Sequence, residues 1–229
     1  MRFGVVSLFP DLIDAGTTAG VIGRGRASGA FEVLHESPRG HASDRHATVD
    51  ARPYGGGAGM VMQAEPLIRA TDNLKRRMAC AAPVALMSPR GQALTQALAA
   101  HLAGHPGLIL IAGRYEGIDQ RYIDSHVDLE ISVGDAVLSG GELPALAVID
   151  AVARTLPGVL GNSESAADES FADGLLEHPQ FTRPEDGEWG RVPAALLSGD
   201  HRKIDAWRLA QALYTTYHSR PDLLVRRGL

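Results

Sequence analysis

Short apolar segments alternate with segments of helical periodicity along the first 160 residues. The apolar segments have the length of buried strands: 3–9, 31–37, 83–88, 107–113 and 127–132. Helical patterns follow Pro10 and cover 21–28, 66–78, 93–103, 118–124 and 142–156, the last stopped by Pro157 and Gly158. Apolar strands in alternation with helices predict an α/β fold, with a parallel sheet and helices on both of its faces.

Two longer segments have no clear period. Residues 38–62 are too polar and glycine-rich for a regular element, and loops of this length are functional or disordered more often than not. Residues 160–188 combine weak periodicity with many acidic and small residues, which is typical of a linker. We therefore expect neither segment to contribute a helix or strand to the core.

From Pro193 onward the pattern predicts a small helical domain. Its main helix would begin at Ser198 to Asp200 and turn four apolar residues inward, Ile204, Trp207, Leu209 and Leu213. A unit of this size buries little core by itself. We expect a domain over 1–160, a flexible linker over 161–175 and a helical C-terminal domain over 176–229.

Composition narrows the class of protein. The chain has 229 residues, of which 45% are hydrophobic, enough for one α/β domain or for one larger and one smaller domain. Cys80 is the single cysteine, which excludes an internal disulfide and a cysteine-based zinc site and fits a reducing cytosol. The N-terminal apolar run ends at Pro10 without the length or flanks of a signal peptide, and no run approaches transmembrane length.

Charge is distributed unevenly along the chain. The net charge of −5 argues against a general nucleic-acid coating protein. Residues 161–190 carry eight acidic side chains against Arg183, whereas residues 201–229 carry six basic side chains against Asp205 and Asp222. A basic patch on an acidic protein suits a specific anionic partner, although a solvated helix face would give the same pattern.

Three loops follow apolar strands and are candidates for ligand binding: 88–91, 113–117 and 133–141. If their strands are parallel neighbours, all three lie at the carboxyl edge of one sheet, where α/β folds bind ligands. The adjacent Gly140 and Gly141 would let backbone approach a ligand closely, and a tight strand-to-helix turn is the plain alternative. No P-loop or dinucleotide fingerprint is present, so the loops suit an uncharged group such as an adenosine better than a polyphosphate.

Other polar residues have simpler interpretations. His41 and His46, with Asp44 or Asp50, could be considered metal ligands, but we expect surface residues and no metal site. Serines near glycines lack the nucleophile-elbow motif. Asp150 and Arg154 have the spacing of an ion pair within a helix, and the acids of 164–169 have the composition of a solvated linker.

Several longer motifs resemble one known family. They are DRH (44–46), DARPYGGGAGM (50–60), LMSPRG (86–91), GRYEGID (113–119), SVGDAVLSGGELPA (132–145), PGVLGN (157–162), ESF (169–171), GLLEHPQFTRP (174–184) and LLSGDH (196–201). In this order and spacing the chain resembles the bacterial tRNA (guanine-37-N(1)-) methyltransferases of the knotted SPOUT superfamily. The resemblance covers nearly the whole chain.

The resemblance implies a deep trefoil knot and a bound S-adenosylmethionine. The donor would be held in a bent shape by Leu86, Ser88, Pro89, Gly113, Tyr115, Glu116, Gly117, Val133, Gly134, Asp135, Ala136, Val137, Leu138, Gly140 and Gly141. It further implies a cytoplasmic, obligate homodimer with active sites shared between subunits, and a C-terminal domain that binds the anticodon branch of tRNA. A requirement for Mg²⁺ does not follow from the residues.

The resemblance also assigns catalytic roles. Methylation of guanine N1 requires a general base, and removal of the proton places negative charge on the 6-oxo group. The family pattern gives the stabilising guanidinium to Arg154 and the base to the position of Glu169, where the family usually has aspartate. Asp168 precedes it, so either carboxylate could be the base. Ala136 stands where the family often has an aromatic residue, which changes the packing around the donor.

Two alternatives stay open. The first is a SPOUT methyltransferase that acts on another RNA or on a nucleoside. The second is an RNA-binding protein without catalytic activity. Matches in the linker and C-terminal segment count against the first alternative. The donor loops, Arg154 and a carboxylate at 169 count against the second.

Overall fold

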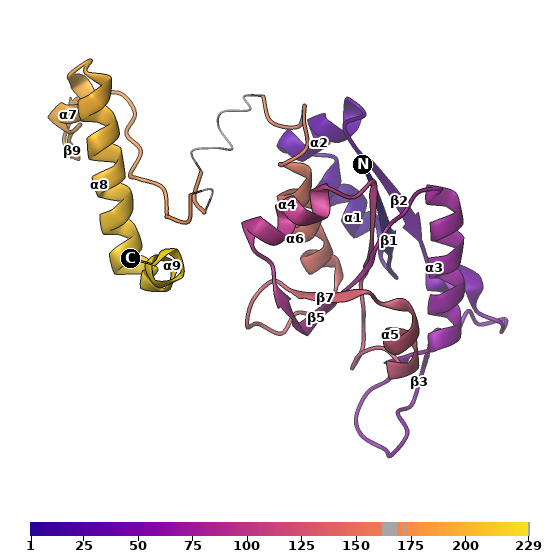
Figure 1. Cartoon of the computed structure of the whole chain (residues 1–229). Helices are drawn as coiled ribbons and strands as arrows, with labels where there is room; N and C mark the ends of the chain where they lie inside the picture. Colours follow the sequence, from indigo (N-terminus) through magenta and orange to yellow (C-terminus); the bar gives the residue numbers. More distant parts are fainter. Residues whose placement is uncertain (162–168, 172, 229) are drawn as a thin grey trace. The chain divides into compact units, whose positions relative to one another are not determined.

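The computed structural model describes residues 1–161, 169–171 and 173–228, in two compact units, Met1–Gly161 and Asn162–Leu229. Figure 1 shows the elements of each unit along the chain. Among the described residues, no helix has the length and apolar character needed to cross a membrane.

A parallel sheet of five strands forms the centre of the first unit. The strands are β1 (Arg2–Val6), β2 (Glu32–Glu36), β5 (Val84–Ala93), β6 (Gly107–Ile111) and β7 (Leu129–Ser132). Their order in space is β2-β1-β6-β5-β7, and every neighbouring pair is parallel. The predicted α/β fold with a parallel sheet is therefore confirmed.

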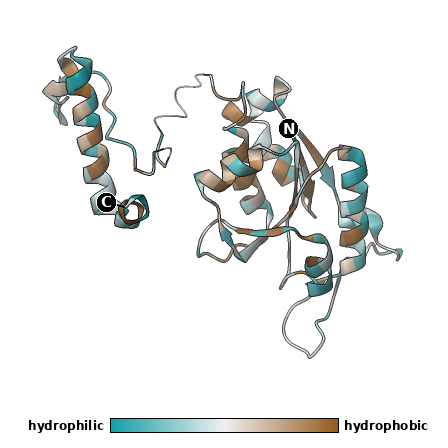
Figure 2. Ribbon diagram, in the orientation of Figure 1, coloured by the Kyte–Doolittle hydropathy of each residue, from teal (hydrophilic) through white to brown (hydrophobic). Residues whose placement is uncertain are grey.

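Helices cover both faces of this sheet. The first face carries α1 (Pro10–Thr17), α2 (Gly20–Ala27), α4 (Gln96–Ala103) and α6 (Glu142–Ala153), and the second carries α3 (Ala64–Met78) and α5 (Gln120–His126). Because strand side chains alternate between faces, Leu108 and Leu110 enter the first core and Ile109 and Ile111 the second. Figure 2 shows the resulting apolar strands and the polar outer surface of α3.

Strand β5 does not end at the Pro-Arg-Gly sequence, contrary to the prediction. Both Met87 and Gln92 pair with Ile131, so residues 88–91 protrude as an irregularity and the strand resumes. A side chain at Gly91 would lie 2.3 Å from the Ile131 nitrogen, so only glycine lets β7 pass this closely. The ladder thus continues on the far side of the candidate loop.

Residues 38–62 contain more regular structure than their composition predicts. A 3₁₀ helix, η1 (Pro38–His41), is followed by the antiparallel strands β3 (Asp50–Ala51) and β4 (Val61–Met62). Met62 is completely buried and pairs with Ile118. The expectation that this segment contributes no strand to the core was wrong. Pairing with distant residues forms its strands, although its sequence has no regular hydrophobic period.

The second unit is built around one long helix. It contains β8 (Asp186–Gly187), β9 (Gly190–Arg191), α7 (Ala194–Leu197), α8 (His201–Ser219) and α9 (Pro221–Arg227). Asp200 accepts hydrogen bonds from the first turn of α8, as the predicted helix start requires. Trp207 contacts the rings of His178 and Phe181, but Leu209 is 53% exposed, so its predicted inward orientation was wrong.

Part of the expected linker, residues 162–168 and 172, lies outside the described residues, and its flexibility stays a prediction. The residues described after it belong to the second unit. Leu175 is buried, and the Leu176 N–H donates to Thr216 Oγ1 of α8 at 2.8 Å. Glu177 N–H donates to Ser170 Oγ at 3.0 Å.

Candidate functional site

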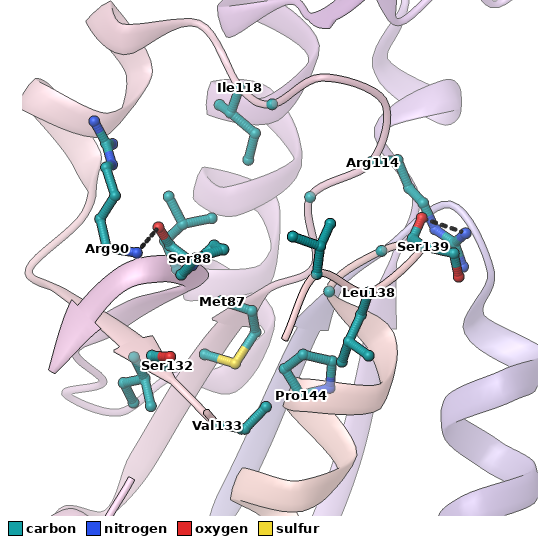
Figure 3. Close-up of a pocket in the computed structure, with 18 of the residues that line it drawn as sticks. Met87, Ser88, Arg90, Arg114, Ile118, Ser132, Val133, Leu138, Ser139 and Pro144 are labelled. Atoms are coloured by element: carbon teal, nitrogen blue, oxygen red, sulfur yellow. Dashed lines mark hydrogen bonds between the residues drawn. The ribbon is translucent and has the colours of Figure 1, made fainter. Parts of the chain in front are cut away.

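A pocket of about 550 Å³ lies where the chain leaves strands β5, β6 and β7. Its walls are formed by residues 86–90, by residues 113–118 and by most of residues 132–141. These strands are adjacent and parallel, so the expected convergence of the three loops at one sheet edge is confirmed. Figure 3 shows side chains from all three segments around the same space.

Most residues implied by the resemblance line this pocket. They are Leu86, Ser88, Pro89, Gly113, Tyr115, Glu116, Gly117, Val133, Gly134, Ala136, Val137, Leu138, Gly140 and Gly141. Asp135, although it is a described residue, is not part of the lining. Their roles toward a ligand stay a prediction.

Further lining residues were not singled out from the sequence. They are Met87, Arg90, Arg114, Ile118, Gln120, Ile123, Ile131, Ser132, Ser139 and Pro144. Arg114 lies in the GRYEG motif of the second candidate loop, and this position could have identified it as a pocket residue. Arg90 donates its backbone N–H to Ser88 Oγ at 3.2 Å, which shapes the turn of the first loop (Figure 3).

Arg114 joins two walls of the pocket. Its Nε donates to Glu142 Oε2 at 2.8 Å and its Nη1 to the Ser139 carbonyl at 3.0 Å. Glu142 is completely buried, and Ser7 Oγ donates to its other oxygen at 2.7 Å. A buried carboxylate needs such partners, because removal from water destabilises an unpaired charge strongly.

Gly140 and Gly141 are required by close contacts within the chain. A Cβ at Gly140 would lie 2.2 Å from Arg114 Nε, and one at Gly141 would lie 2.6 Å from Ala112 Cα. The Gly141 N–H also donates to the Gly113 carbonyl at 2.8 Å. The structure shows that these glycines permit one pocket loop to cross another, and the ligand approach expected of them from the sequence stays a prediction.

Tyr115 has a strained backbone at the pocket wall. Its φ of 61° is a left-handed conformation that non-glycine residues rarely adopt. The neighbouring Glu116 N–H donates to the Met60 carbonyl at 2.9 Å, and Met62 N–H donates to the Gly117 carbonyl at 2.9 Å. These bonds fix the loop 113–117 to β4 and hold Tyr115 at the pocket, a location consistent with function.

The candidate catalytic residues lie apart from these loops along the chain. Arg154 follows the last residue of α6, the helix whose first turn contacts the pocket. Glu169 belongs to the second unit, where it lines a cavity of about 240 Å³ with Asp205 and Arg208 among others. Asp168 lies outside the described residues.

Glu36, His41 and Asp44 are occupied by protein contacts. Glu36 accepts from Arg77 at 2.6 Å and from Asn73 at 2.9 Å, and its other oxygen lies 2.8 Å from His41 Nε2. Burial raises the pKa of the Glu36 carboxyl, but the hydrogen bonds outweigh burial and hold that pKa below its ordinary value. Asp44 accepts from Thr48 Oγ1 at 2.7 Å. These contacts indicate a structural role for this group.

The pocket fits a nucleoside-like ligand. Ligand pockets typically have volumes of roughly 300–1,000 Å³ and few polar groups. This one combines glycine backbone from three loops with apolar side chains such as Ile118, Leu138 and Pro144. The ionisable side chains in its lining are Arg90, Arg114, Tyr115 and Glu116, and Arg114 is already paired with Glu142.

Comparison with known proteins gives a consistent result. Residues 1–226 match the family model described as tRNA (Guanine-1)-methyltransferase TrmD. A tRNA (guanine-N(1)-)-methyltransferase of Pseudoalteromonas translucida is 55% identical over 221 residues, which are 96% of this chain and 87% of that relative. One of Methylococcus capsulatus with the same name is 54% identical over 227 residues, 99% of this chain and 90% of that relative.

Proposed function

The chain belongs to the tRNA (guanine-1)-methyltransferase family, and from this premise we infer that it transfers a methyl group from S-adenosylmethionine to N1 of guanosine 37 in tRNA. The main support for this function is the match to the family model over residues 1–226. It includes the three loops that meet at the pocket and also the second unit. The protein is thus an RNA-modifying methyltransferase.

The donor would bind in the pocket between the three loops. Backbone groups of residues 113–117 and 132–141 would hold its adenosine, and apolar side chains would exclude water. When bound, S-adenosylmethionine supplies an electrophilic methyl group on a positively charged sulfur. The close approach of Gly141 to Ala112, at a sheet edge where three loops line one pocket, supports a trefoil knot of the SPOUT type.

The chain's own residues would manage a proton and a developing charge. Guanine N1 carries a proton, which a carboxylate must accept as the new N–C bond forms. We assign the role of proton acceptor to Glu169, with Asp168 as the alternative. The following residues Ser170 and Phe171 match the family motif and so align Glu169 with the position of the family's base. The guanidinium of Arg154 would stabilise the negative charge that moves onto the 6-oxo group.

A homodimer with shared sites is supported by the position of Arg154. Helix α6 runs from Glu142 at the pocket to Ala153, so Arg154 lies about 18 Å along the axis from the pocket end. That arginine cannot reach a substrate at its own subunit's pocket through a side chain of this length. The pocket of a second copy would give Arg154 its substrate.

Exposed apolar residues beside the pocket support the same assembly. Phe9, Leu12, Val137, Leu138 and Leu143 are each more than one third exposed, and Val137 is 93% exposed. They belong to the starts of the packed helices α1 and α6 and to the loop between β7 and α6. Burial of such a group in a subunit interface would remove it from water.

The tRNA would be held partly by the C-terminal domain. Residues 201–229 carry the basic excess that contacts with phosphate require. The anticodon branch ends in a single-stranded loop, whose target base can be splayed out of the stack and reached at its Watson–Crick edge. A tRNA substrate supports a cytoplasmic location for the enzyme.

Methyl transfer from labelled donor to unmodified tRNA tests the function directly. Transfer should occur to tRNA with guanosine at position 37 and should be lost when only that nucleotide is replaced. Equal transfer to both would indicate another RNA methyltransferase. Binding of tRNA without transfer would indicate an RNA-binding protein.

A further inference from the structure

The loop between β3 and β4 carries an aromatic ring with no covering structure. Tyr54 is 100% exposed, in a segment where residues 51–59 are almost all exposed. Figure 1 shows this loop, which follows β3, extending away from the rest of the first unit. A fully exposed tyrosine gains nothing from the protein core, so its ring is available for a ligand.

The base of the loop is attached to the wall of the pocket. The Met60 carbonyl accepts from Glu116 N–H at 2.9 Å, and the Met62 carbonyl accepts from Asp119 N–H at 3.0 Å. Gly59 lies against the Glu116 side chain, because a Cβ there would be 2.4 Å from the carboxylate. Glu116 also lines the pocket, so the loop rises from the pocket's own rim.

The loop backbone turns on four glycines in left-handed conformations. Gly55, Gly56, Gly57 and Gly59 all have positive φ, between 75° and 122°. These conformations cost glycine little, and a β-branched residue would be strained in them. The two-residue strands at its base are its only regular support among the residues described.

From these observations we propose that Tyr54 stacks on the nucleobase next to the methylated guanine and so positions the RNA over the pocket. The inference rests on the proposed function and deepens it. Tyr54 is absent from the lining formed by the described residues, so its ring meets a neighbouring base and not the target guanine. Aromatic side chains are the usual platform for unstacked bases in RNA loops.

Arg52 is suited to the phosphate beside that base. It is exposed and lies two residues before Tyr54, just after strand β3. Stacking tolerates different bases, and a basic neighbour adds attraction to the backbone. Together the two side chains would hold the strand by its backbone and by one base face.

Binding of tRNA with 2-aminopurine on one or the other side of position 37 tests the inference. Wild-type protein should quench one of the two probes on binding. Tyr54→Ala should lose that quenching and raise the Kd for tRNA roughly 5- to 150-fold, the usual worth of one stacked base. Tyr54→Phe keeps the ring and should retain both properties.

Controls separate stacking from other roles. Trp189 is also exposed, in the turn of the β8–β9 hairpin, and Trp189→Ala should keep the quenching at saturating tRNA. Arg52→Ala should lower the salt dependence of tRNA binding by about one ion, whereas Arg69→Ala, on α3, should not. Circular dichroism and calorimetry with S-adenosylmethionine verify that each variant folds and binds donor.

The outcomes are distinct. Unchanged quenching and affinity in Tyr54→Ala would overturn the inference, and so would equal losses in Tyr54→Phe and Tyr54→Ala. A loss of donor affinity in Tyr54→Ala would assign Tyr54 to the donor site. If wild-type protein is a dimer and Tyr54→Ala is a monomer, Tyr54 would belong to a subunit interface. If wild-type protein fails to methylate tRNA, the proposed function itself fails, independently of Tyr54.

Discussion

The Nε atom of Arg114 lies 2.8 Å from Oε2 of Glu142, and this ion pair connects a pocket loop to the first turn of α6. The same guanidinium lies 4.4 Å from the centre of the Phe9 ring. Ser7, which follows strand β1, donates a hydrogen bond to the other oxygen of the Glu142 carboxylate. The pair therefore holds the loop 139–141 in position and stabilises the first unit.

Replacement of Glu142 tests this relationship. Glu142→Ala should destabilise the protein by about 3 kcal/mol or more, because the partly buried Arg114 and the buried Ser7 lose their common partner. Urea denaturation gives the change, and donor calorimetry should show weakened binding. Arg69→Ala removes an exposed ion pair with Glu65 and should cost less than about 1 kcal/mol. Similar costs for both variants would contradict the assigned role of Glu142.

The two glycines of the third loop should respond differently to alanine. Gly141→Ala places a methyl group against the Ala112 backbone, which cannot move aside, and should abolish donor binding. Gly140→Ala meets the Arg114 side chain, so part of its effect should disappear in an Arg114→Ala background. Gly161→Ala has open space and serves as the control. Calorimetry on folded variants decides, and wild-type affinity in Gly141→Ala would refute the crossing argument.

The catalytic base can be assigned by amide substitutions. Glu169→Gln keeps the shape of the side chain but removes the proton acceptor, and should slow methyl transfer roughly 10²-fold or more. Donor affinity should hardly change, because the carboxylate acts on guanine. Asp168→Asn should cost much less, and Glu169→Asp should keep part of the activity. Single-turnover rates are the measurement, and a severe Asp168→Asn with a mild Glu169→Gln would make Asp168 the base.

Mixed subunits test the shared active site. An Arg154→Ala subunit combined with a Gly141→Ala subunit should recover activity, because one site of each mixed dimer keeps both an intact pocket and an intact arginine. Random exchange at equal concentrations should give about a quarter of the wild-type activity. Each variant alone should be inactive. Failure to recover in verified mixed dimers, or an active monomer in sedimentation, would exclude the shared arrangement.

Acid stability should depend on Glu36. Its pKa is lowered in the folded state, so the carboxylate stabilises the fold above its ordinary pKa of 4.5, and this is lost as pH falls through the folded value. Glu36→Gln should lower stability by roughly 1–3 kcal/mol at pH 7 and by less below pH 4. Urea denaturation between pH 3 and 7 measures the difference. A gap between Glu36→Gln and wild type that is constant with pH would argue against this assignment.

Much of the fold followed from local pattern. Strands such as 107–111 are apolar throughout because both faces of a parallel sheet are covered, and this signal needs no knowledge of distant residues. The convergence of three loops was predictable for a related reason, since neighbouring parallel strands end at one edge. The start of α8 after Asp200 was likewise predictable from the local sequence.

The tertiary structure decided what local pattern cannot encode. Glu142 is an ordinary helix-start acid by sequence, but its partners Ser7 and Arg114 are 135 and 28 residues away. Leu209 fits the helical period yet is exposed, and Met62 lies in a polar segment yet is buried. Gly140 and Gly141 look like ligand-binding glycines, but their Cβ positions are filled by Arg114 and Ala112. Periodicity determines which face of an element is apolar, whereas contacts between distant segments exist only once the sheet has brought its loops together.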